Sequence, residues 1–291
     1  MSQSLAGVVL GLGSACIDTF LEVERVPAAG GKVMLRRELD LPGGQVASTL
    51  VGCVRLGVGA RFLLRTGADA AGARIRSTLA AAGVDLGPAR VLPGVASASA
   101  YILHDASGER TVIWRAPERL AVTAEEIAPE LLAGVAAVFC DGRDGAATLR
   151  LARMARERGI PVVGDLDYWY PHTGELLRWV DHLVVPASFD LPADTGAATV
   201  VVTRGAAGSV GWEAGGARVE VPAYPAAMVD TTGAGDAYHA GYLVGLVEGW
   251  DLAQRMRFAS ATAALACGGL GAQGALPTRA EVEALLRRHP A

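Results

Sequence analysis

Residues Asp230 to Leu243 read D-T-T-G-A-G-D-A-Y-H-A-G-Y-L. The small residues Gly233, Ala234 and Gly235 stand directly before Asp236, and an apolar helical pattern then continues to about residue 247. Small residues at a loop-to-helix junction let backbone N–H groups point at one spot, where the helix N-terminus adds about half a positive charge. This arrangement predicts an anion site. The carboxylate of Asp236 beside it indicates a base that takes the proton of a hydroxyl while charge develops on a phosphoryl group.

The composition fits one large α/β domain or two small ones: the chain has 291 residues, of which 51% are hydrophobic. The net charge of −4, with both signs interspersed, gives no nucleic-acid footprint, and no apolar run is long enough to cross a membrane. The four cysteines are scattered without a C-x-x-C pair, which is typical of reduced thiols in a cytoplasmic protein. The apolar run at 5–17 follows no basic residue and contains glycines, so it predicts a first strand rather than a signal peptide.

Strand-like and helix-like segments alternate along most of the chain. Strands are predicted at 8–12, 61–66, 135–140, 161–165, 182–185 and 199–203. Helices are predicted at 43–57, 70–83, 145–158, 173–180, 236–248, 252–266 and 278–288. This alternation predicts an α/β fold with a mostly parallel central sheet flanked by helices.

Two segments, 19–42 and 97–115, show a different, loosely alternating pattern. The first has a turn at 27–31 and the second has a turn at Ser107-Gly108. Both are hairpin-like. We expect them to form a small β-sheet apart from the main core.

Polar residues follow several of the predicted strands. They are Ser14 with Asp18 after the first strand, then the runs 140–143, 164–167 and 203–208. Because the carboxyl ends of parallel strands meet at one edge of the sheet, these residues should converge on one crevice. Asp18 either hydrogen-bonds sugar hydroxyls or caps a turn. Asp165 and Asp167 either lie near a metal ion or sugar, or one of them caps the following helix.

The stretch from Asp230 to Leu243 resembles, position for position, the C-terminal signature of the ribokinase-like (PfkB) carbohydrate kinases. The pair Gly43-Gly44, with the helix end at Leu56-Gly57, resembles the N-terminal signature G-G-x-x-x-N-x-A of that family, although Ser48 replaces its Asn. The run T-R-G-A-A-G at 203–208 resembles a third family motif, which contacts nucleotide phosphates. The resemblance covers essentially the whole chain. It implies a single ribokinase-like kinase domain at 1–291, in which 19–42 and 97–115 form a lid over the sugar.

The resemblance also implies roles for individual residues. Asp236 would be the catalytic base, and the backbone N–H groups of Gly233, Ala234 and Gly235 would receive charge on the transferring phosphoryl group. The cofactors would be ATP and Mg²⁺, and the protein would form a homodimer through the lid. The family motif N-x-x-E is reduced to 186–190, so Asp190 would contact Mg²⁺ through water. Sugar contacts would come from Asp18, Gly43, Gly44 and Ser48, and ATP contacts from Thr203, Gly205, Gly208, Gly268 and Gly274.

Lys32 and Arg143 give an indication of which sugar accepts the phosphoryl group. Lys32 is the only lysine among the 26 basic residues and lies in the first lid segment, whereas Arg143 follows a predicted strand. A cationic pair suits an anionic sugar, and both residues resemble positions of the sulfofructose kinases, which phosphorylate C1 of 6-deoxy-6-sulfofructose. Lys32 can also be a solvated lid residue, and Arg143 a structural ion-pair partner. A neutral sugar such as fructose or ribose, a nucleoside, and a sugar- or nucleotide-sensing protein without turnover remain alternatives.

Overall fold

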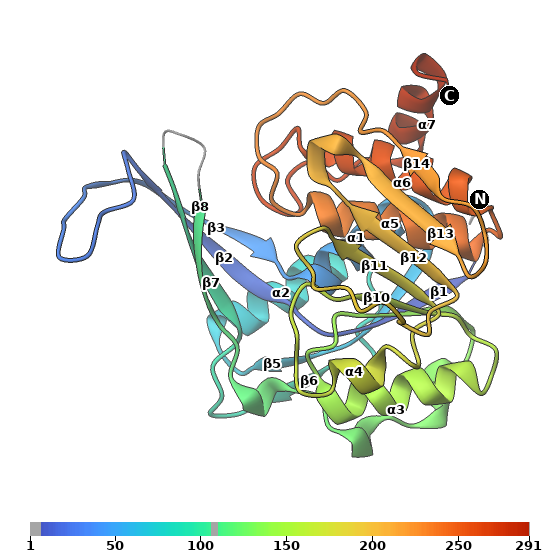
Figure 1. Cartoon of the computed structure of the whole chain (residues 1–291). Coiled ribbons are helices and arrows are strands. Elements are labelled where there is room, and N and C mark those ends of the chain that lie inside the picture. The colour runs from blue at the N-terminus through green and yellow to red at the C-terminus, as the bar shows by residue number, and fades with distance from the viewer. Residues whose placement is uncertain (1–6, 106–109, 291) are drawn as a thin grey trace.

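An eight-stranded sheet forms the centre of the protein in the computed structural model, which describes residues 7–105 and 110–290 (Figure 1). Its strand order is β14-β13-β12-β11-β10-β9-β1-β4. The strands are β1 (Val8–Leu12), β4 (Gly59–Leu63), β9 (Val135–Cys140), β10 (Val162–Asp165), β11 (His182–Pro186), β12 (Thr199–Thr203), β13 (Ser209–Glu213) and β14 (Val219–Val221). All neighbouring pairs from β12 to β4 are parallel, and β13 and β14 extend the sheet as antiparallel edge strands.

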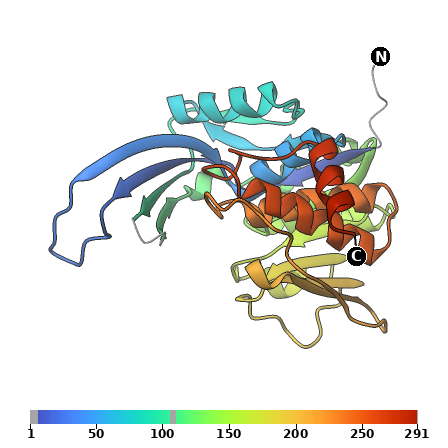
Figure 2. The ribbon, with the colours of Figure 1, turned by 90° about the horizontal axis from the view of Figure 1, so that it is seen from above.

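Helices cover both faces of this sheet (Figure 2). One face carries α1 (Gln45–Arg55), α2 (Ala70–Ala81), α5 (Ala234–Val247), α6 (Leu252–Ala266) and α7 (Arg279–Arg288). The opposite face carries α3 (Gly145–Arg156) and the short α4 (Thr173–Leu176). Alternate strand residues belong to the two apolar clusters, because successive side chains of a strand point to opposite faces: Val9 lies in one cluster and Leu10 in the other.

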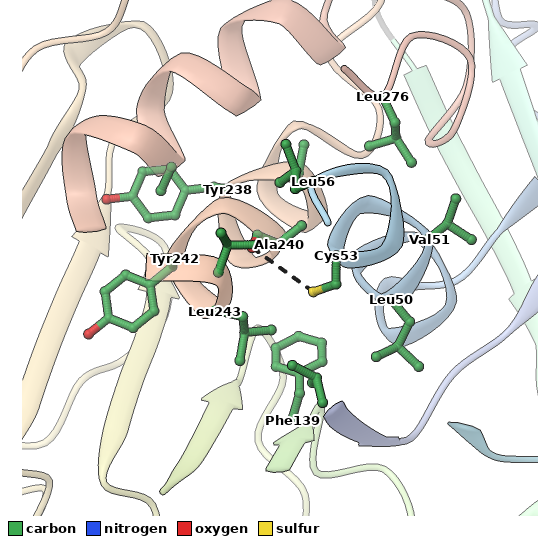
Figure 3. Close-up of a cluster of buried hydrophobic side chains, with 14 of the residues drawn as sticks. Leu50, Val51, Cys53, Leu56, Phe139, Tyr238, Ala240, Tyr242, Leu243 and Leu276 are labelled. Carbon is green, nitrogen blue, oxygen red and sulfur yellow. Dashed lines mark hydrogen bonds between the residues drawn. The ribbon is translucent and has the colours of Figure 1, made fainter. Parts of the chain in front are cut away.

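Helices α1 and α5 lie side by side over the middle of the sheet (Figure 3). The thiol of Cys53 on α1 lies 4.0 Å from the carbonyl oxygen of Ala240 on α5. Gly52 permits this approach, because a Cβ atom there would lie 2.6 Å from Cβ of Ala240. The contact positions the start of α5 above the carboxyl ends of the strands.

A second sheet has four strands in the order β3-β2-β7-β8. Its strands are β2 (Cys16–Val23), β3 (Leu35–Gly43), β7 (Ser99–His104) and β8 (Arg110–Arg115). It curves away from the main sheet and its helices (Figures 1 and 2). The strands come from the two segments for which a separate small sheet was expected, and the turn predicted at Ser107-Gly108 lies outside the described residues.

Some sequence-based predictions of elements are wrong in detail. The strand predicted at 61–66 is divided into β4 and β5 (Arg65–Gly67), and β5 pairs with β6 (Arg90–Leu92) instead of the main sheet. The helix predicted at 173–180 ends at Leu176. Strands β13 and β14 were not predicted, because they are short and Gly211 interrupts the apolar pattern of the first. Four 3₁₀ turns complete the structure: η1 (Glu118–Leu120), η2 (Ala124–Glu126), η3 (Pro129–Leu132) and η4 (Gly205–Ala207). Over the described residues, no helix is long and apolar enough to span a membrane.

Candidate active site

The first turn of α5 faces the carboxyl ends of the strands and is held by its own loop. The carboxylate of Asp230 accepts hydrogen bonds from the backbone N–H (2.9 Å) and hydroxyl (2.8 Å) of Thr232 and from the backbone N–H of Gly271 (2.8 Å). Gly233, the residue before the helix, has φ 77°, and a Cβ atom there would lie 2.4 Å from Cα of Ala272. This junction therefore needs glycine, both for its backbone conformation and for the close contact.

The N–H groups of this turn are not all free to receive an anion. Ala234 donates to the carbonyl oxygen of Thr231 at 3.2 Å, and Ala237 donates to that of Gly233 at 2.9 Å. Between them, Gly235 and Asp236 have no backbone acceptor for their N–H groups among the described residues. The predicted contribution of Ala234 is thus weakened in this conformation, whereas the N–H of Asp236 becomes an additional candidate. The helix N-terminus remains a suitable place for a phosphoryl group.

Asp236 stands among acidic side chains from other elements. Burial raises the pKa of Asp236 well above its usual range, and the carboxylate of Asp165 raises it further, as do Asp167 and Asp18. His239, one turn further along α5, opposes this effect. A carboxylate with a raised pKa binds a proton more readily near neutral pH, which suits a general base.

Asp18 lies on β2 at the base of the small sheet, and its side chain is buried. The thiol of Cys16 donates a hydrogen bond to its Oδ1 atom at 3.1 Å. Burial, followed by the Asp18 carboxylate, raises the pKa of this thiol well above its usual range, so the thiol remains a donor. Gly43 leaves room for the carboxylate, because a Cβ atom there would lie 2.0 Å from Oδ2 of Asp18.

The ends of β1 and β9 are joined by Asp141. Its carboxylate accepts hydrogen bonds from the N–H of Ser14 at 2.8 Å and of Arg143 at 3.1 Å. The Ser14 hydroxyl in turn accepts from the N–H of Gln45 at the start of α1 (3.1 Å). Gly44 has φ 98°, and a Cβ atom there would lie 2.5 Å from Cα of Ala15. The strand ends and the α1 N-terminus therefore form one rigid floor.

A cavity of about 330 Å³ lies between this floor and the small sheet. Such a volume is at the lower end of the range for small-molecule sites. Ser14, Gly44 and Gln45 line it from the floor, and Val112 and Trp114 line it from β8. Its remaining polar and aromatic lining includes Arg115, Asp141, Arg143, Asp167, Tyr168 and Tyr170.

Arg143 and Arg115 are among the residues that line this cavity. Arg143 is half-buried and Arg115 is exposed, and neither guanidinium contacts a carboxylate within 4.0 Å in the described part of the chain. The alternative of a structural ion pair for Arg143 is therefore not seen. Arg115 was not predicted from the sequence, because an arginine at the end of a strand of the small sheet has no distinctive local pattern. The aromatic run at 168–170 after a strand end was an available signal for Tyr168 and Tyr170.

Of the predicted site residues, Gly44 and Arg143 line the cavity. Lys32, Ser48 and Asp190 are among those that do not. Lys32 is exposed in the connection between β2 and β3, which extends away from the main sheet (Figure 1). Ser48 is fully buried on α1, and its hydroxyl accepts a hydrogen bond from the side chain of Gln273 at 3.3 Å. The Asp190 side chain is exposed, and its backbone carbonyl accepts from Trp169 at 3.2 Å. Arg143 therefore lines the cavity and Lys32 does not, so the role of Lys32 toward the sugar stays a prediction.

The predicted nucleotide residues lie on two loops. Thr203 ends β12, and the loop after it closes through the N–H of Arg204, which donates to the Gly208 carbonyl at 2.7 Å. Gly205 and Gly208 have φ of 55° and 81°. A Cβ atom at residue 208 would lie 2.1 Å from the Val221 carbonyl oxygen, so packing against β14 by itself requires glycine there.

The second loop follows α6. Gly268 lines a groove of about 590 Å³ together with Arg55, Ala264, Pro277 and the segment 225–227. A Cβ atom at Gly274 would lie 2.2 Å from the Leu270 carbonyl oxygen. Gly274 thus has a structural reason for being glycine, while Gly268 borders open space that could receive part of a ligand.

Comparisons with known proteins agree over nearly the whole chain. The profile of the pfkB family carbohydrate kinases matches residues 9–279. Ribokinase of Bacillus subtilis (strain 168) is 29% identical over 292 residues, covering 94% of this chain and 98% of that enzyme. The ATP-dependent ribose-1-phosphate kinase of Halopiger xanaduensis is 30% identical over 295 residues, covering 96% and 97%. The structure of Arabidopsis thaliana ribokinase complexed with ribose and ATP has a TM-score of 0.85 and 26% identity, covering 97% of this chain and 99% of that one.

Proposed function

The chain belongs to the pfkB family of carbohydrate kinases and is a phosphotransferase acting on a sugar hydroxyl, and from this premise we propose that its acceptor is an anionic ketose. The preferred candidate is 6-deoxy-6-sulfofructose, phosphorylated at its C1 hydroxyl. The observation that supports this proposal is that Arg143 and Arg115 both line one small cavity, and neither has an ion-pair partner among the described residues. A guanidinium binds a sulfonate, carboxylate or phosphate through two parallel hydrogen bonds.

The homologues are compatible with an anionic acceptor. The Halopiger relative is named for ribose 1-phosphate, which is itself an anionic sugar. The resemblance to sulfofructose kinases rests on the sequence motifs alone, and we propose Arg115, which lines the cavity, in place of Lys32 as the second cation. Trp114, Tyr168 and Tyr170 on the same cavity favour a nucleoside as the second candidate, because aromatic rings stack on a base.

The reaction follows from the groups around α5. The acceptor oxygen attacks the γ-phosphorus of ATP, the bond to the bridging oxygen breaks and ADP leaves, while Asp236 takes the acceptor proton. The N–H groups of Gly235 and Asp236 stabilise the negative charge of the transferring phosphoryl group, and the N–H group of Gly233 lies beside them. Asp18, between Gly43 and Cys16, hydrogen-bonds and orients the sugar, with Gly44 forming part of the pocket floor.

ATP would lie across the two glycine-containing loops. Its phosphates would contact the turn of Thr203, Gly205 and Gly208, and its base would lie near Gly268 and Gly274. We propose that magnesium is bound mainly by the ATP phosphates and water. The described residues include no group of three or more His, Cys, Asp or Glu side chains that could hold a metal ion by themselves. Mg²⁺ would neutralise charge on the phosphates, and Asp190 is the proposed water-mediated contact.

The small sheet would serve as the lid and as a dimer interface. Tyr101 and Ile113 pair across β7 and β8 on one of its faces, and they are 49% and 58% exposed. Two large apolar side chains exposed next to each other offer an apolar contact for a partner. We propose a homodimer formed through this face. Analytical ultracentrifugation of the wild type and of Ile113→Lys tests it, and a wild-type monomer at micromolar concentration would refute it.

A substrate panel tests the proposed function. ATP consumption is measured with 6-deoxy-6-sulfofructose, fructose 6-phosphate, fructose, ribose, 2-keto-3-deoxygluconate and a nucleoside. We expect the highest kcat/KM for an anionic sugar. A preference for a neutral sugar or for the nucleoside would refute the anionic acceptor but not the kinase. Measurable sugar binding without turnover on any acceptor would favour the sensing protein.

A further inference from the structure

His239 joins the first turn of α5 to the ends of two central strands. The side chain is 4% exposed and packs against Phe139, with 5.4 Å between ring centroids. Its Nδ1 atom lies 2.8 Å from the Gly235 carbonyl oxygen. Its Nε2 atom lies 3.2 Å from the Val184 carbonyl oxygen and 3.6 Å from Oδ1 of Asp165. Both ring nitrogens therefore face oxygen atoms.

This geometry fixes the number of protons on the pair formed by His239 and Asp165. The contact with Gly235 needs a proton on Nδ1, because a carbonyl oxygen can only accept. The Val184 carbonyl oxygen can likewise only accept, so its contact at 3.2 Å favours a second proton on Nε2, and the Asp165 carboxyl group lies 3.6 Å from that nitrogen. Whether it resides on the ring or on the carboxyl, the pair has no net charge. An isolated carboxylate in this buried position would be costly, so the shared proton is the favourable arrangement.

The pair is also connected to the sugar pocket. Oδ2 of Asp165 accepts a hydrogen bond from the side chain of Gln45 at 3.3 Å, and Gln45 lines the cavity. A continuous series of contacts therefore runs from the cavity through Gln45, Asp165 and His239 to the carbonyl of Gly235. The titratable groups around Asp236 are Cys16 and Asp18 from β2, Asp165 and Asp167 from the end of β10, and His239 from α5 itself.

We propose that His239 is a positioning residue for phosphoryl transfer, and this inference rests on the proposed role of Asp236 as the base. Its Nδ1–H group holds the Gly235 carbonyl, which belongs to the same peptide group as the N–H of Asp236. That hydrogen bond orients and polarises the N–H that receives the anion. The second proton of the pair compensates the negative charge of Asp165 near Asp236 and leaves the Asp236 carboxyl free to ionise.

Two polar substitutions separate these effects. Asparagine places its amide near the position of Nδ1, and glutamine places its amide near the position of Nε2. His239→Asn should keep the contact with Gly235 and lose the shared proton. The acid limb of its kcat/KM–pH profile should therefore move upward by about one pH unit, because a like charge disfavours ionisation of Asp236. His239→Gln should lose the contact with Gly235, and its kcat should fall ~10–100-fold with KM little changed.

Adding Asp165→Asn to His239→Asn supplies the decisive measurement. The neutral amide removes the uncompensated charge, so the acid limb should return to the wild-type position. All profiles are measured with ATP and the acceptor on which the wild type is most active, and circular dichroism follows the melting temperature. A histidine with only a structural role would lower the melting temperature and leave the acid limb unmoved, and that result would overturn the inference.

Asp236→Asn, assayed in parallel, separates the inference from its premise. Wild-type turnover in Asp236→Asn would refute the base itself. Loss of turnover in Asp236→Asn, together with wild-type kcat and pH profiles in both His239 variants, would refute the role of His239 and leave the base in place. An acid limb that does not return on adding Asp165→Asn would also refute it.

Discussion

Replacing Gly43 with Ala should displace the Asp18 carboxylate without unfolding the protein. A Cβ atom at residue 43 would lie 2.0 Å from Oδ2 of Asp18, whereas ordinary contacts begin at 3.4 Å, so the oxygen must retreat by about 1.4 Å. Gly43 is not among the glycines with positive φ, so the backbone itself accepts alanine. Asp18 has a short side chain that can turn away, and the main loss in the fold is its hydrogen bond with Cys16.

The functional loss should be larger than the loss of stability. A displacement of about 1 Å in a substrate-positioning group costs about 10²-fold in rate. We therefore expect kcat/KM of Gly43→Ala to fall by ~10²-fold, in an ATP-consumption assay with the preferred acceptor. One weak thiol–carboxylate hydrogen bond contributes about 1 kcal/mol, so the melting temperature should drop by only a few degrees.

Two comparisons make this prediction specific. Gly174→Ala on α4 is the matched control, because a Cβ atom there meets nothing within 4 Å, and its kinetics should be those of the wild type. Asp18→Ala should lose a similar factor, and the double variant with Gly43→Ala should be no worse, because both changes act on one group. Wild-type kcat/KM in Gly43→Ala, with the fold intact, would refute the reasoning that ties Gly43 to Asp18.

Three further predictions address the base, the pocket and acid stability. Asp236→Asn should lower kcat by ~10²–10⁴-fold in steady-state assays, and wild-type turnover would contradict its role. Arg143→Ala and Arg115→Ala should each raise KM for an anionic acceptor ~10–100-fold and leave KM for neutral sugars unchanged. Lys32→Ala should change KM for neither kind of sugar. A raised KM for the anionic acceptor in Lys32→Ala would show that its loop reaches a sugar-binding cavity. Burial, followed by Arg255, lowers the pKa of His182 to about 4, so the folded state holds this histidine neutral. The contribution of neutral His182 to the free energy of unfolding is complete above pH ~6.5 and is lost as the pH falls toward 4. At pH 5 the loss amounts to about 2 kcal/mol. Urea unfolding of His182→Gln at pH 7.5 and pH 5 should show a smaller acid loss than the wild type, and equal losses would contradict it.

Much of the fold could be predicted because its signals are local. The patterns of β9, β10, β11 and β12, of the helices α3, α6 and α7, the α5 signature and the origin of the small sheet all depend on neighbouring residues. The prediction failed where a local pattern was weak. Strands β13 and β14 need β12 beside them to become strands, and α4 is shorter than its sequence pattern.

The site was predictable only in part, because most of its contacts join residues far apart in the chain. Asp18, Gly44 and Arg143 were chosen from motifs and strand ends; Gly44 and Arg143 line the cavity, and the Asp18 carboxylate lies beside Gly43. Arg115 and Gln45 had no motif. Their importance follows from the cavity between the two sheets and from the hydrogen bond of Gln45 to Asp165.

The sequence by itself determined the family, the reaction and the helix start at Gly233 to Asp236, because a glycine-rich junction before a carboxylate is a local chemical requirement. Only the tertiary structure decided which cations line the cavity and what surrounds Asp236. Lys32 belongs to a loop that extends away from the main sheet, and Arg115 ends strand β8 of the small sheet, beside the cavity. His239 looks like an ordinary helical residue until β10 and β11 bring two oxygen acceptors to its ring. Burial and charge depend on those distant contacts, and a linear sequence does not display them.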